Sequence, residues 1–398
     1  MSYLEDGYVL WPVPPDWDAG VREQLEWLTD VIEARTGAKQ KRELRLGPRR
    51  QFTFEVIAND QSRRVLDMIL ADHGSNYWLL PIWHDVQLLP ALDAGVDTIP
   101  CKTAGFELIV DSLVVVWASV NNWWLAAIED VGEDYITTGL PTDRAWPAGS
   151  RLYPVRLARL DRQPEEAAWT DTAGTRSVVM RIEEPSDWPA VLPATMYQGW
   201  PVLDMRPDTG DDLKSSFSRT TNVIDEDTGA ITIIDRPGRA FREQSLRYLL
   251  GSRAELAAMR SLLYGLRGRA GHVWVPSWAQ DLLIVAPVTA VATTITIEWA
   301  GYSLFGRAQS GRRDIRIELT DGTVLYRRIT AAVAAGANET LTIDSALGRA
   351  VQPSEILIVS FMALSELASD RVELLHETDG DGLTEVKLDF LGVRRESA

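Results

Sequence analysis

One stretch of the sequence places two residues that could do chemistry side by side. In LLPIWHDVQLL, residues 79–89, His84 and Asp85 follow Trp83 and are flanked by apolar residues. A histidine next to a carboxylate can act as a general base, or the two can supply ligands to a metal ion. The same pattern also fits the polar side of a strand, whose apolar side chains face a core.

Other motifs that carry chemistry are missing. The sequence has no GxxxxGK[ST] phosphate loop, no GxSxG nucleophile elbow and no HExxH helix. The four histidines are scattered without the spacing of metal ligands; they are His73, His84, His272 and His376. A glycosidase needs one pair of carboxylates, and none of the 57 acidic residues is marked out as such a pair. We therefore expect no enzymatic activity and no cofactor.

Two further metal patterns are incomplete. Glu377–Gly382, ETDGDG, resembles the start of a calcium loop, but Leu388 occupies the place of the closing glutamate. This segment is predicted to be a glycine-rich hairpin turn. Cys101 is the only cysteine, so the chain has no internal disulfide and no thiolate cage; between apolar neighbours it is predicted to be a small buried residue.

The elements that would position these residues occur twice along the chain. Four short patterns recur in the same order, 189 to 192 residues later: Trp11-Pro12 as Trp200-Pro201, Val31-Ile32 as Val223-Ile224, Pro48/Arg50/Phe52 as Pro237/Arg239/Phe241, and Ser62-Arg63 as Ser252-Arg253. Ordered repetition at a nearly constant offset indicates two copies of one unit. We expect a first repeat over residues 1–195 and a second over 196–398, joined in the proline-rich stretch 184–194.

Each repeat is predicted to contain one short amphipathic helix. Apolar residues follow helical spacing at Val65, Leu66, Ile69 and Leu70, and again at Leu256, Met259, Leu262 and Leu263. In the second repeat, Ser252 and Glu255 have the spacing of a capping box. After each helix comes a Pro-x-Trp element, Pro81 and Trp83 in the first repeat and Pro276 and Trp278 in the second. Ala279 replaces His84 there, so we predict a structural role for His84 rather than a catalytic or metal-binding pair with Asp85.

The rest of each repeat is predicted to be β. Alternating apolar runs around tight turns predict a hairpin over 113–128 and a counterpart over 315–326. Further strands are expected at 135–137, 152–157, 341–343 and 356–359, and each repeat should close with a strand, 177–182 and 384–391. The fold class is therefore mainly β (α+β): two tandem β-rich units with one short helix each. A small β-barrel or sandwich insertion is expected at about 90–160 and about 286–365.

Composition limits the classes of function. The chain has 398 residues, 45% of them apolar, and a formal net charge of −17. Such acidity disfavours tight nucleic-acid binding, which depends on cations that neutralise phosphates, and suits a surface past which DNA moves. The start of the chain lacks the pattern of a signal peptide, and the most apolar run, 113–118, is shorter than the roughly 20 residues of a membrane span. We expect a cytoplasmic product with no membrane anchor.

The tryptophans leave two interpretations open. Eleven of the 15 lie in the first repeat, and the neighbours Trp123 and Trp124 should point to opposite faces of a strand. Exposed tryptophans can line a sugar-binding face, whereas buried ones pack a core or a subunit interface. Packing is the favoured interpretation, with Trp123 and Trp124 as candidate interface residues.

The combined pattern resembles the distal tail and related tail-tip proteins of long-tailed bacteriophages. The resemblance spans both repeats and is carried by arginines before a helix, a tryptophan-bearing strand and a small β-domain: Pro48-Arg49-Arg50, Pro237-Gly238-Arg239, Leu113–Trp117, Trp146–Gly149 and Leu152–Pro154. Two features differ from the family. This chain is doubled, and it lacks the cysteine cluster of the iron–sulfur hub proteins.

The resemblance implies a virion tail protein, assembled in the host cytoplasm, with a tail-tube-like sheet in each repeat. Such proteins form non-enzymatic rings around a DNA channel, with the tail tube, tape measure and baseplate hub proteins as partners. Because the resembled tubes are six-fold, three doubled chains could form a pseudo-hexameric ring, with a hexamer as the alternative. A carbohydrate-binding receptor module of a phage tail is the runner-up function, and a glycoside hydrolase is less favoured.

Overall fold

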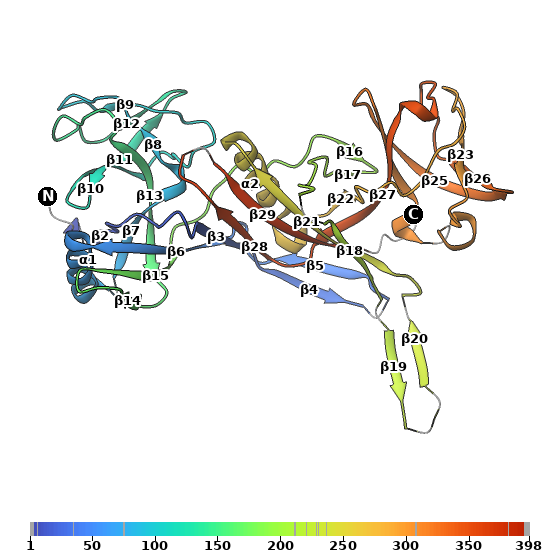
Figure 1. The fold of residues 1–398 in the computed structure, drawn as a ribbon, viewed down its shortest axis with the longest axis horizontal. Coiled ribbons are helices and arrows are strands. Elements are labelled where there is room, and N and C mark those ends of the chain that lie inside the picture. The colour runs from blue at the N-terminus through green and yellow to red at the C-terminus, as the bar shows by residue number, and fades with distance from the viewer. Residues whose placement is uncertain are drawn as a thin grey trace.

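A computed structural model describes most of the chain. It covers residues 4–5, 7–34, 36–74, 76–210, 212–219, 221–227, 229, 231–235, 237–306, 309–380 and 382–393. Part of the first six residues, and Asp381 of the calcium-like turn, lie outside this described part. The protein is elongated, with a small β-lobe at each end of a central sheet (Figure 1). The mainly β fold class is confirmed.

The first half, up to about residue 195, contains one α-helix and most of one lobe. Its elements are β1 Leu4–Glu5, β2 Tyr8–Leu10, β3 Val21–Glu26, β4 Thr29–Glu33, β5 Lys39–Glu43, β6 Arg49–Asn59, α1 Asp60–His73, β7 Tyr77–Pro81, the 3-10 turn η1 Trp83–Asp85, β8 Gln87–Leu88, β9 Thr98–Pro100, β10 Leu113–Ser119, β11 Asn122–Val131, β12 Tyr135–Thr138, β13 Arg151–Leu160, β14 Glu166–Ala168 and β15 Ala173–Ile182.

The second half has a closely similar order of elements. These are β16 Met196–Tyr197, β17 Trp200–Pro201, β18 Lys214–Ser218, β19 Thr221–Asp225, β20 Ile231–Asp235, β21 Phe241–Leu250, α2 Arg253–Leu266, η2 Gly268–Ala270, β22 Val273–Pro276, β23 Thr294–Glu298, η3 Tyr302–Gly306, η4 Ser310–Arg312, β24 Asp314–Leu319, β25 Val324–Ala335, β26 Asn338–Ile343, η5 Pro353–Glu355, β27 Ile356–Leu367, β28 Arg371–His376 and β29 Thr384–Gly392. Both predicted hairpins are present, as β10–β11 and β24–β25.

Each half builds a small antiparallel sheet with the same neighbours. In the first half the order is β3, β6, β15, β14; in the second it is β18, β21, β29, β28. The alternating sequence of β6 explains its place, because every second side chain from Arg50 to Ala58 is buried. The helix that follows β6 or β21 packs its apolar stripe against this sheet.

The two small sheets are joined side by side into one. β28 of the second half pairs with β3 of the first half over six residue pairs, from Arg371↔Glu26 to His376↔Val21. The central sheet therefore runs β18, β21, β29, β28, β3, β6, β15, β14. Among the described strands, β18 pairs only with β21 and β14 only with β15, so they stand at its two ends.

The two lobes are insertions with cores of their own. Leu89, Ile99, Trp124 and Trp146 belong to the core of the first lobe, and a second core spans the lobe from Leu282 to Phe361. Each lobe extends from the strand after the helix and returns to the central sheet through β13 or β27. Among the described residues, no helix is long and apolar enough to cross a membrane.

Strand register places Pro81 and Pro276 at the same point of the two halves. Pro81 pairs with Val155 of β13, and Ala158, three residues on, pairs with β15. Pro276 pairs with Met362 of β27, and Ser365, three residues on, pairs with β29. The tryptophans after them differ in surroundings. Trp83 is buried against Tyr153, whereas Trp278 has a left-handed φ of 56° and packs against guanidinium groups.

The predicted match of Arg50 with Arg239 is corrected by the register. In the first half, Phe52 pairs with Met180, which pairs with Leu160 of β13. In the second half, Gln244 pairs with Phe390, which pairs with Leu367 of β27. Two residues earlier on each strand stand Arg50 and Arg242. Arg239 instead lies in the bend before β21. The sequence alignment missed this because the Pro-x-Arg-x-Phe pattern recurs 189 residues later, whereas β6 and β21, like the hairpins before them, are offset by 192 residues.

The helix starts show a similar correction. The N-caps are Asn59 and Ser252, so α1 begins two residues before Ser62, the residue at which we expected its pattern to open. Ser252 accepts the Glu255 backbone N–H as expected.

Trp123 and Trp124 are also placed differently from the prediction of an interface. They do point to opposite faces of β11, but both faces are covered: Trp123 belongs to the core of the central sheet and Trp124 to the core of the lobe. Because β11 lies between two cores, neither side chain is available to a partner.

Candidate functional site: a buried ionic cluster between the halves

The structure brings together two histidines from opposite ends of the sequence. His84 in η1 and His376 in β28 stack face to face, with ring centroids 3.7 Å apart and an interplanar angle of 4°. His84 does not lie on the polar side of a strand, as one interpretation of its sequence had it; it sits in a buried 3-10 turn. Two of the four histidines that are scattered in the sequence therefore meet, because β28 pairs with β3 at the junction of the halves.

The two rings differ in their hydrogen bonds. His376 contacts the Glu23 carboxylate through Nε2 at 3.1 Å and the Thr384 hydroxyl through Nδ1 at 2.9 Å. Neither ring nitrogen of His84 makes a hydrogen bond to a described residue, although Oδ1 of Asp85 lies 3.5 Å from its Nε2. Glu23 itself is 0% exposed.

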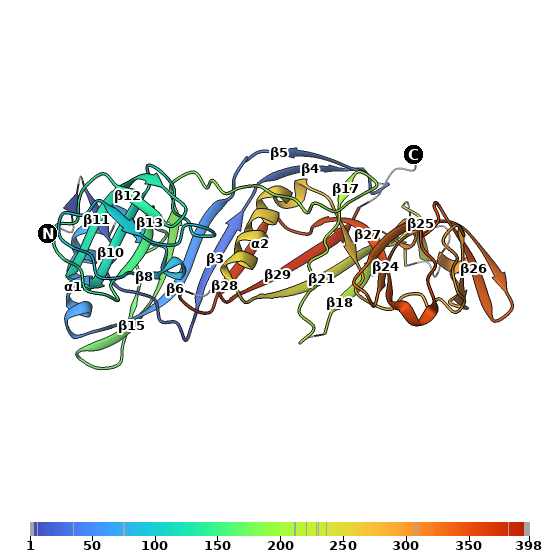
Figure 2. The same cartoon turned by 90° about the horizontal axis from the view of Figure 1, so that it is seen from above.

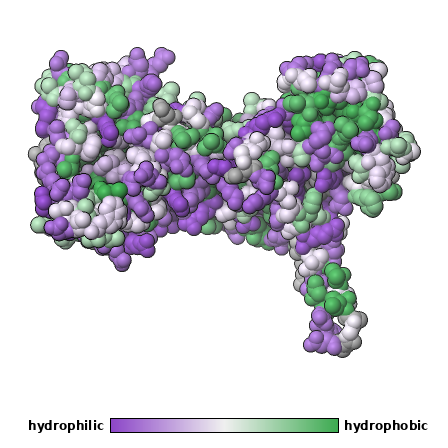
Figure 3. All heavy atoms as spheres, viewed as in Figure 1, coloured by the Kyte–Doolittle hydropathy of each residue, from purple (hydrophilic) through white to green (hydrophobic). Residues whose placement is uncertain are grey.

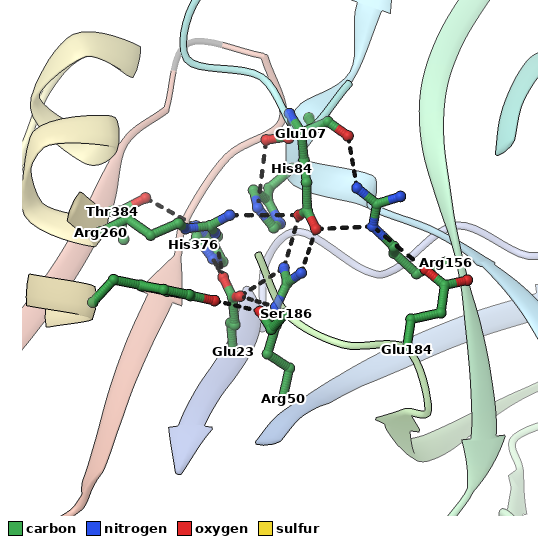
Figure 4. A network of polar contacts seen from close by, with 12 residues as sticks. Glu23, Arg50, His84, Glu107, Arg156, Glu184, Ser186, Arg260, His376 and Thr384 are labelled. Carbon is green, nitrogen blue, oxygen red and sulfur yellow. Dashed lines mark hydrogen bonds and ion pairs between the residues drawn. The ribbon is translucent and has the colours of Figure 1, made fainter. Parts of the chain in front are cut away.

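Arginines from both halves surround these side chains (Figure 4). Glu23 accepts hydrogen bonds from Nε of Arg50 at 2.8 Å and from Nη2 of Arg260 at 2.6 Å. Glu107, from the segment before β10, accepts from Nη2 of Arg50 at 2.8 Å and from Nε of Arg156 at 2.9 Å. We call the whole set the junction cluster: Glu23, Arg50, His84, Asp85, Glu107 and Arg156 from the first half, and Arg253, Arg260 and His376 from the second.

Asp85 ties α2 to the first half. Its Oδ1 pairs with the guanidinium of Arg253, and its Oδ2 accepts the backbone N–H of Glu107 at 2.9 Å. Arg253 and Arg260 lie two turns apart on α2, so they reach the cluster from the same face of the helix.

Burial and charge set the ionisation of the cluster. Burial by itself would raise the pKa of Glu23, but Arg260 and Arg50 outweigh it and hold the pKa well below its usual value. The pKa of Glu107 is likewise lowered, against the effect of burial, by Arg50 and Arg156. Burial lowers the pKa of both His84 and His376, so both rings are neutral at neutral pH.

The cluster is poorly suited to a metal ion. Glu23, His84 and His376 do offer ligand atoms within 4.8 Å of one another. However, two parallel stacked rings cannot both direct an in-plane lone pair at one ion, and both Glu23 oxygens are already bound by arginines. Four guanidinium groups nearby also oppose a cation.

The cluster is equally unsuited to catalysis. His84 is 1% exposed and Asp85 is 2% exposed, so a substrate cannot reach the imidazole. Both carboxylate oxygens of Asp85 are occupied by other partners. What the arrangement can do is hold two units together, because its buried carboxylates are each paired with guanidinium groups, those of Glu23 and Asp85 with arginines of the other half. That His84 and Asp85 are not a functional pair stays a prediction.

Sequence reasoning missed most of this cluster, although one signal was present. Arg260 falls on the apolar stripe of α2, next to Met259 and Leu263, and a cation in such a place requires a buried acidic partner. Its partners Glu23 and Glu107 are ordinary acids in the sequence. Only the pairing of β28 with β3 brings them within reach.

A hairpin adds a second contact between the halves (Figure 2). The β4–β5 hairpin of the first half lies along the second half, where Nζ of Lys39 is 2.9 Å from Glu366 and Lys41 also pairs with Glu366. At its base, the Thr29 backbone N–H and hydroxyl both donate to Asp370 at 2.8 Å.

Comparison with known proteins does not place the chain in a family. The sequence matches no protein-family model and no curated protein. The argument for function therefore rests on the geometry of the chain itself.

Proposed function

We propose that this protein is a structural component of a phage tail tip, in which several copies form a ring that joins the tail tube to the distal hub and lines the DNA channel. The observation that carries this proposal is the way the two halves join. β28 of one unit adds to β3 of the next, and the matching strands β14 and β18 remain at the two ends of the sheet.

A second copy can repeat this junction. β14 holds the same place beside β15 that β28 holds beside β29, and β18 holds the same place beside β21 that β3 holds beside β6. Adding β14 of one copy to β18 of the next would therefore continue the sheet by the same edge-to-edge pairing. A head-to-tail contact of this kind closes into a ring when its rotation permits.

The second hairpin supports the same arrangement. β19–β20 has the same two five-residue strands as β4–β5, each 192 residues later. Whereas β4–β5 covers the second half of its own chain, β19–β20 projects from the molecule (Figure 1). Its residues Val223, Ile231 and Ile233 are 56%, 61% and 66% exposed, and the apolar surface is visible in Figure 3. A neighbouring copy would cover that surface.

The number of chains follows from the resemblance to six-fold tail tubes. Three doubled chains supply six units, so we propose a homotrimer that forms a pseudo-hexameric ring, with six chains as the alternative. The tail tube, tape measure and hub proteins are the proposed neighbours in the virion tail. The net charge of −17 suits a channel that repels the phosphates of passing DNA.

Electron microscopy of the purified protein tests this proposal, together with the mass of the assembly in solution. We expect a ring with an axial channel and three chains. Six chains per ring would overturn the trimer and leave the ring; a monomer at all concentrations would overturn the ring. A carbohydrate-binding module is not proposed, since Trp123 and Trp124 are both buried.

A further inference from the structure

The described part of the second half contains a cavity of about 430 Å³. It opens beside the end of β18, between the central sheet and the second lobe. Its main charged and aromatic lining residues are Phe217, Arg219, Arg242, Asp281, Arg312 and Phe361. In a chain with a net charge of −17, a cavity with three arginines and one aspartate is a local reversal of charge.

This cavity is the second half's counterpart of the junction cluster. The cluster is built from β3, β6, the turn after β7 and the segment before β10, which supply Glu23, Arg50, Asp85 and Glu107. The cavity is built from the matching elements: β18, β21, the turn after β22 and the segment before β24. Arg242 holds the register position of Arg50. In the first half this place is filled by α2.

The two places carry opposite charge. In the first half, Glu23, Asp85 and Glu107 receive Arg253 and Arg260 of α2. In the second half the arginines line the cavity. Arg312 stacks on Phe217 and Phe361 and lies 3.6 Å from Asp281. The Nε of Arg242 is buried without a hydrogen-bond partner among the described residues.

The two helices also differ in charge at matching positions, and each is opposite in charge to the place that it would fill. α1 and α2 each have 14 residues, with Asn59 and Ser252 as N-caps. The first and eighth residues of α2 are Arg253 and Arg260, which enter the junction cluster. The first and eighth residues of α1 are Asp60 and Asp67. The Asp67 side chain is 36% exposed, against 4% for Arg260.

We infer that the cavity receives helix α1 of a second copy of this chain, with Asp60 and Asp67 set against Arg242 and Arg312. This rests on the proposed ring and names the contact that closes it. Within the chain, Glu23, Asp85 and Glu107 of the first half bind Arg253 and Arg260 of α2. Between chains, with the charges exchanged, Arg242 and Arg312 of one copy would bind Asp60 and Asp67 of another.

The exchange of charge between the two places would also determine the order of first and second halves around the ring. α2 placed at the cavity would set Arg253 and Arg260 against Arg242 and Arg312, and α1 placed at the junction cluster would set Asp67 against Glu23. Like charges at a buried contact cost several kcal/mol and exclude the wrong partner. First and second halves must then alternate around the ring.

The existing contacts of Asp67 leave room for this role. Among the described residues, its Oδ1 pairs with Arg176, and its Oδ2 lies 3.8 Å from Arg63. Asp60 is exposed at the first turn of α1. Two guanidinium groups of a partner, one for each carboxylate, could pair with Asp60 and Asp67 without breaking a contact within the chain.

Charge reversal tests the inference on the full-length protein. Asp60→Arg and Arg312→Glu, each alone, should weaken self-association about tenfold or more, measured by sedimentation over a range of concentrations. The two changes combined in one chain should restore association with itself. Asp143→Arg and Arg349→Glu, exposed charges on the two lobes, serve as matched controls and should leave it unchanged. Thermal unfolding checks that each variant is folded.

A cross-link gives a second readout. In a Cys101→Ser chain, Asp60→Cys together with Arg312→Cys should yield disulfide-linked multimers on oxidation, while either cysteine alone should yield none. If the wild type forms rings but the reversals leave association unchanged and no multimers appear, the inference is wrong and the ring stands. If the wild type stays monomeric and no cross-link forms, both are wrong.

Discussion

His84 and His376 lie with their ring planes 4° from parallel and their centroids 3.7 Å apart, although one belongs to the first half of the chain and the other to the second. The stack is closed on one side by Glu23 and its two arginines. Because both rings are buried, the junction between the halves depends on their neutral form.

The first prediction concerns pH. The folded-state pKa values of His84 and His376 lie below the unfolded value near 6.5, so their contribution to stability is full above that pH and is lost as pH falls below it. The free energy of unfolding, measured in urea, should therefore decrease from pH 7.5 to pH 5. His272, whose pKa is lowered to about 4 by burial and Lys41, adds to the same trend.

A variant separates the stacked pair from His272. His84→Leu keeps an apolar side chain in the place of the ring and removes one titrating group, so the decrease of stability with acid should be shallower than in the wild type. His272→Leu serves as the comparison. An unchanged pH dependence in His84→Leu would contradict the buried neutral pair.

The second prediction concerns Arg260. Arg260→Ala leaves Glu23 buried with one guanidinium fewer, and breaking a buried pair typically costs about 3–5 kcal/mol. Arg267→Ala, at the residue that caps the C-terminus of the same helix, removes a largely exposed pair with Glu43 and should cost less than about 1 kcal/mol. Urea unfolding measures both, and similar costs would mean that Arg260 is not an essential part of the junction.

The third prediction concerns the hairpin β4–β5. Asp370 accepts from the Thr29 backbone N–H, the Thr29 hydroxyl and the Arg269 backbone N–H. Asp370→Ala removes the carboxylate that accepts all three of these hydrogen bonds at the base of the hairpin. Hydrogen exchange should then become faster at residues 29–43 and stay unchanged in the two lobes. Equally fast exchange throughout the molecule would indicate global destabilisation instead of release of the hairpin.

The fourth prediction concerns the projecting hairpin. Ile231→Lys with Ile233→Lys should weaken self-association while leaving the unfolding temperature of the free chain within about 1–2 °C, because both side chains are exposed in it. Val333→Lys, at an exposed strand position of the second lobe, is the control. Light scattering across concentrations measures the effect, and unchanged association would remove the hairpin from the proposed interface.

The fifth prediction concerns metal. Because arginines hold both Glu23 oxygens, added Zn²⁺ should not raise the unfolding temperature, and titration calorimetry should detect no binding that His84→Ala abolishes. Binding lost in that variant would show that the cluster rearranges around an ion.

Local pattern alone determined much of the fold. Apolar runs located β10 and β27, alternating runs located β15 and β29, and the apolar stripe with Ser252 located α2. These signals depend only on neighbours in sequence. The recurrence of Pro81 at Pro276 is confirmed by strand register. Arg239 was assigned to the wrong position because the short Pro-x-Arg-x-Phe pattern recurs three residues away from the strand register that the structure shows.

Only the tertiary structure decided which residues meet. His84 and Asp85 carry no sign in sequence of His376, Arg253 or Glu107, because pairing of β28 with β3 depends on the whole course of the chain. The burial of both Trp123 and Trp124 likewise required a second core on the far face of β11. Charge shows the same division. Composition determined the total of −17. The fold determined that acids of the first half gather at the junction cluster, whereas arginines of the second half line the matching cavity.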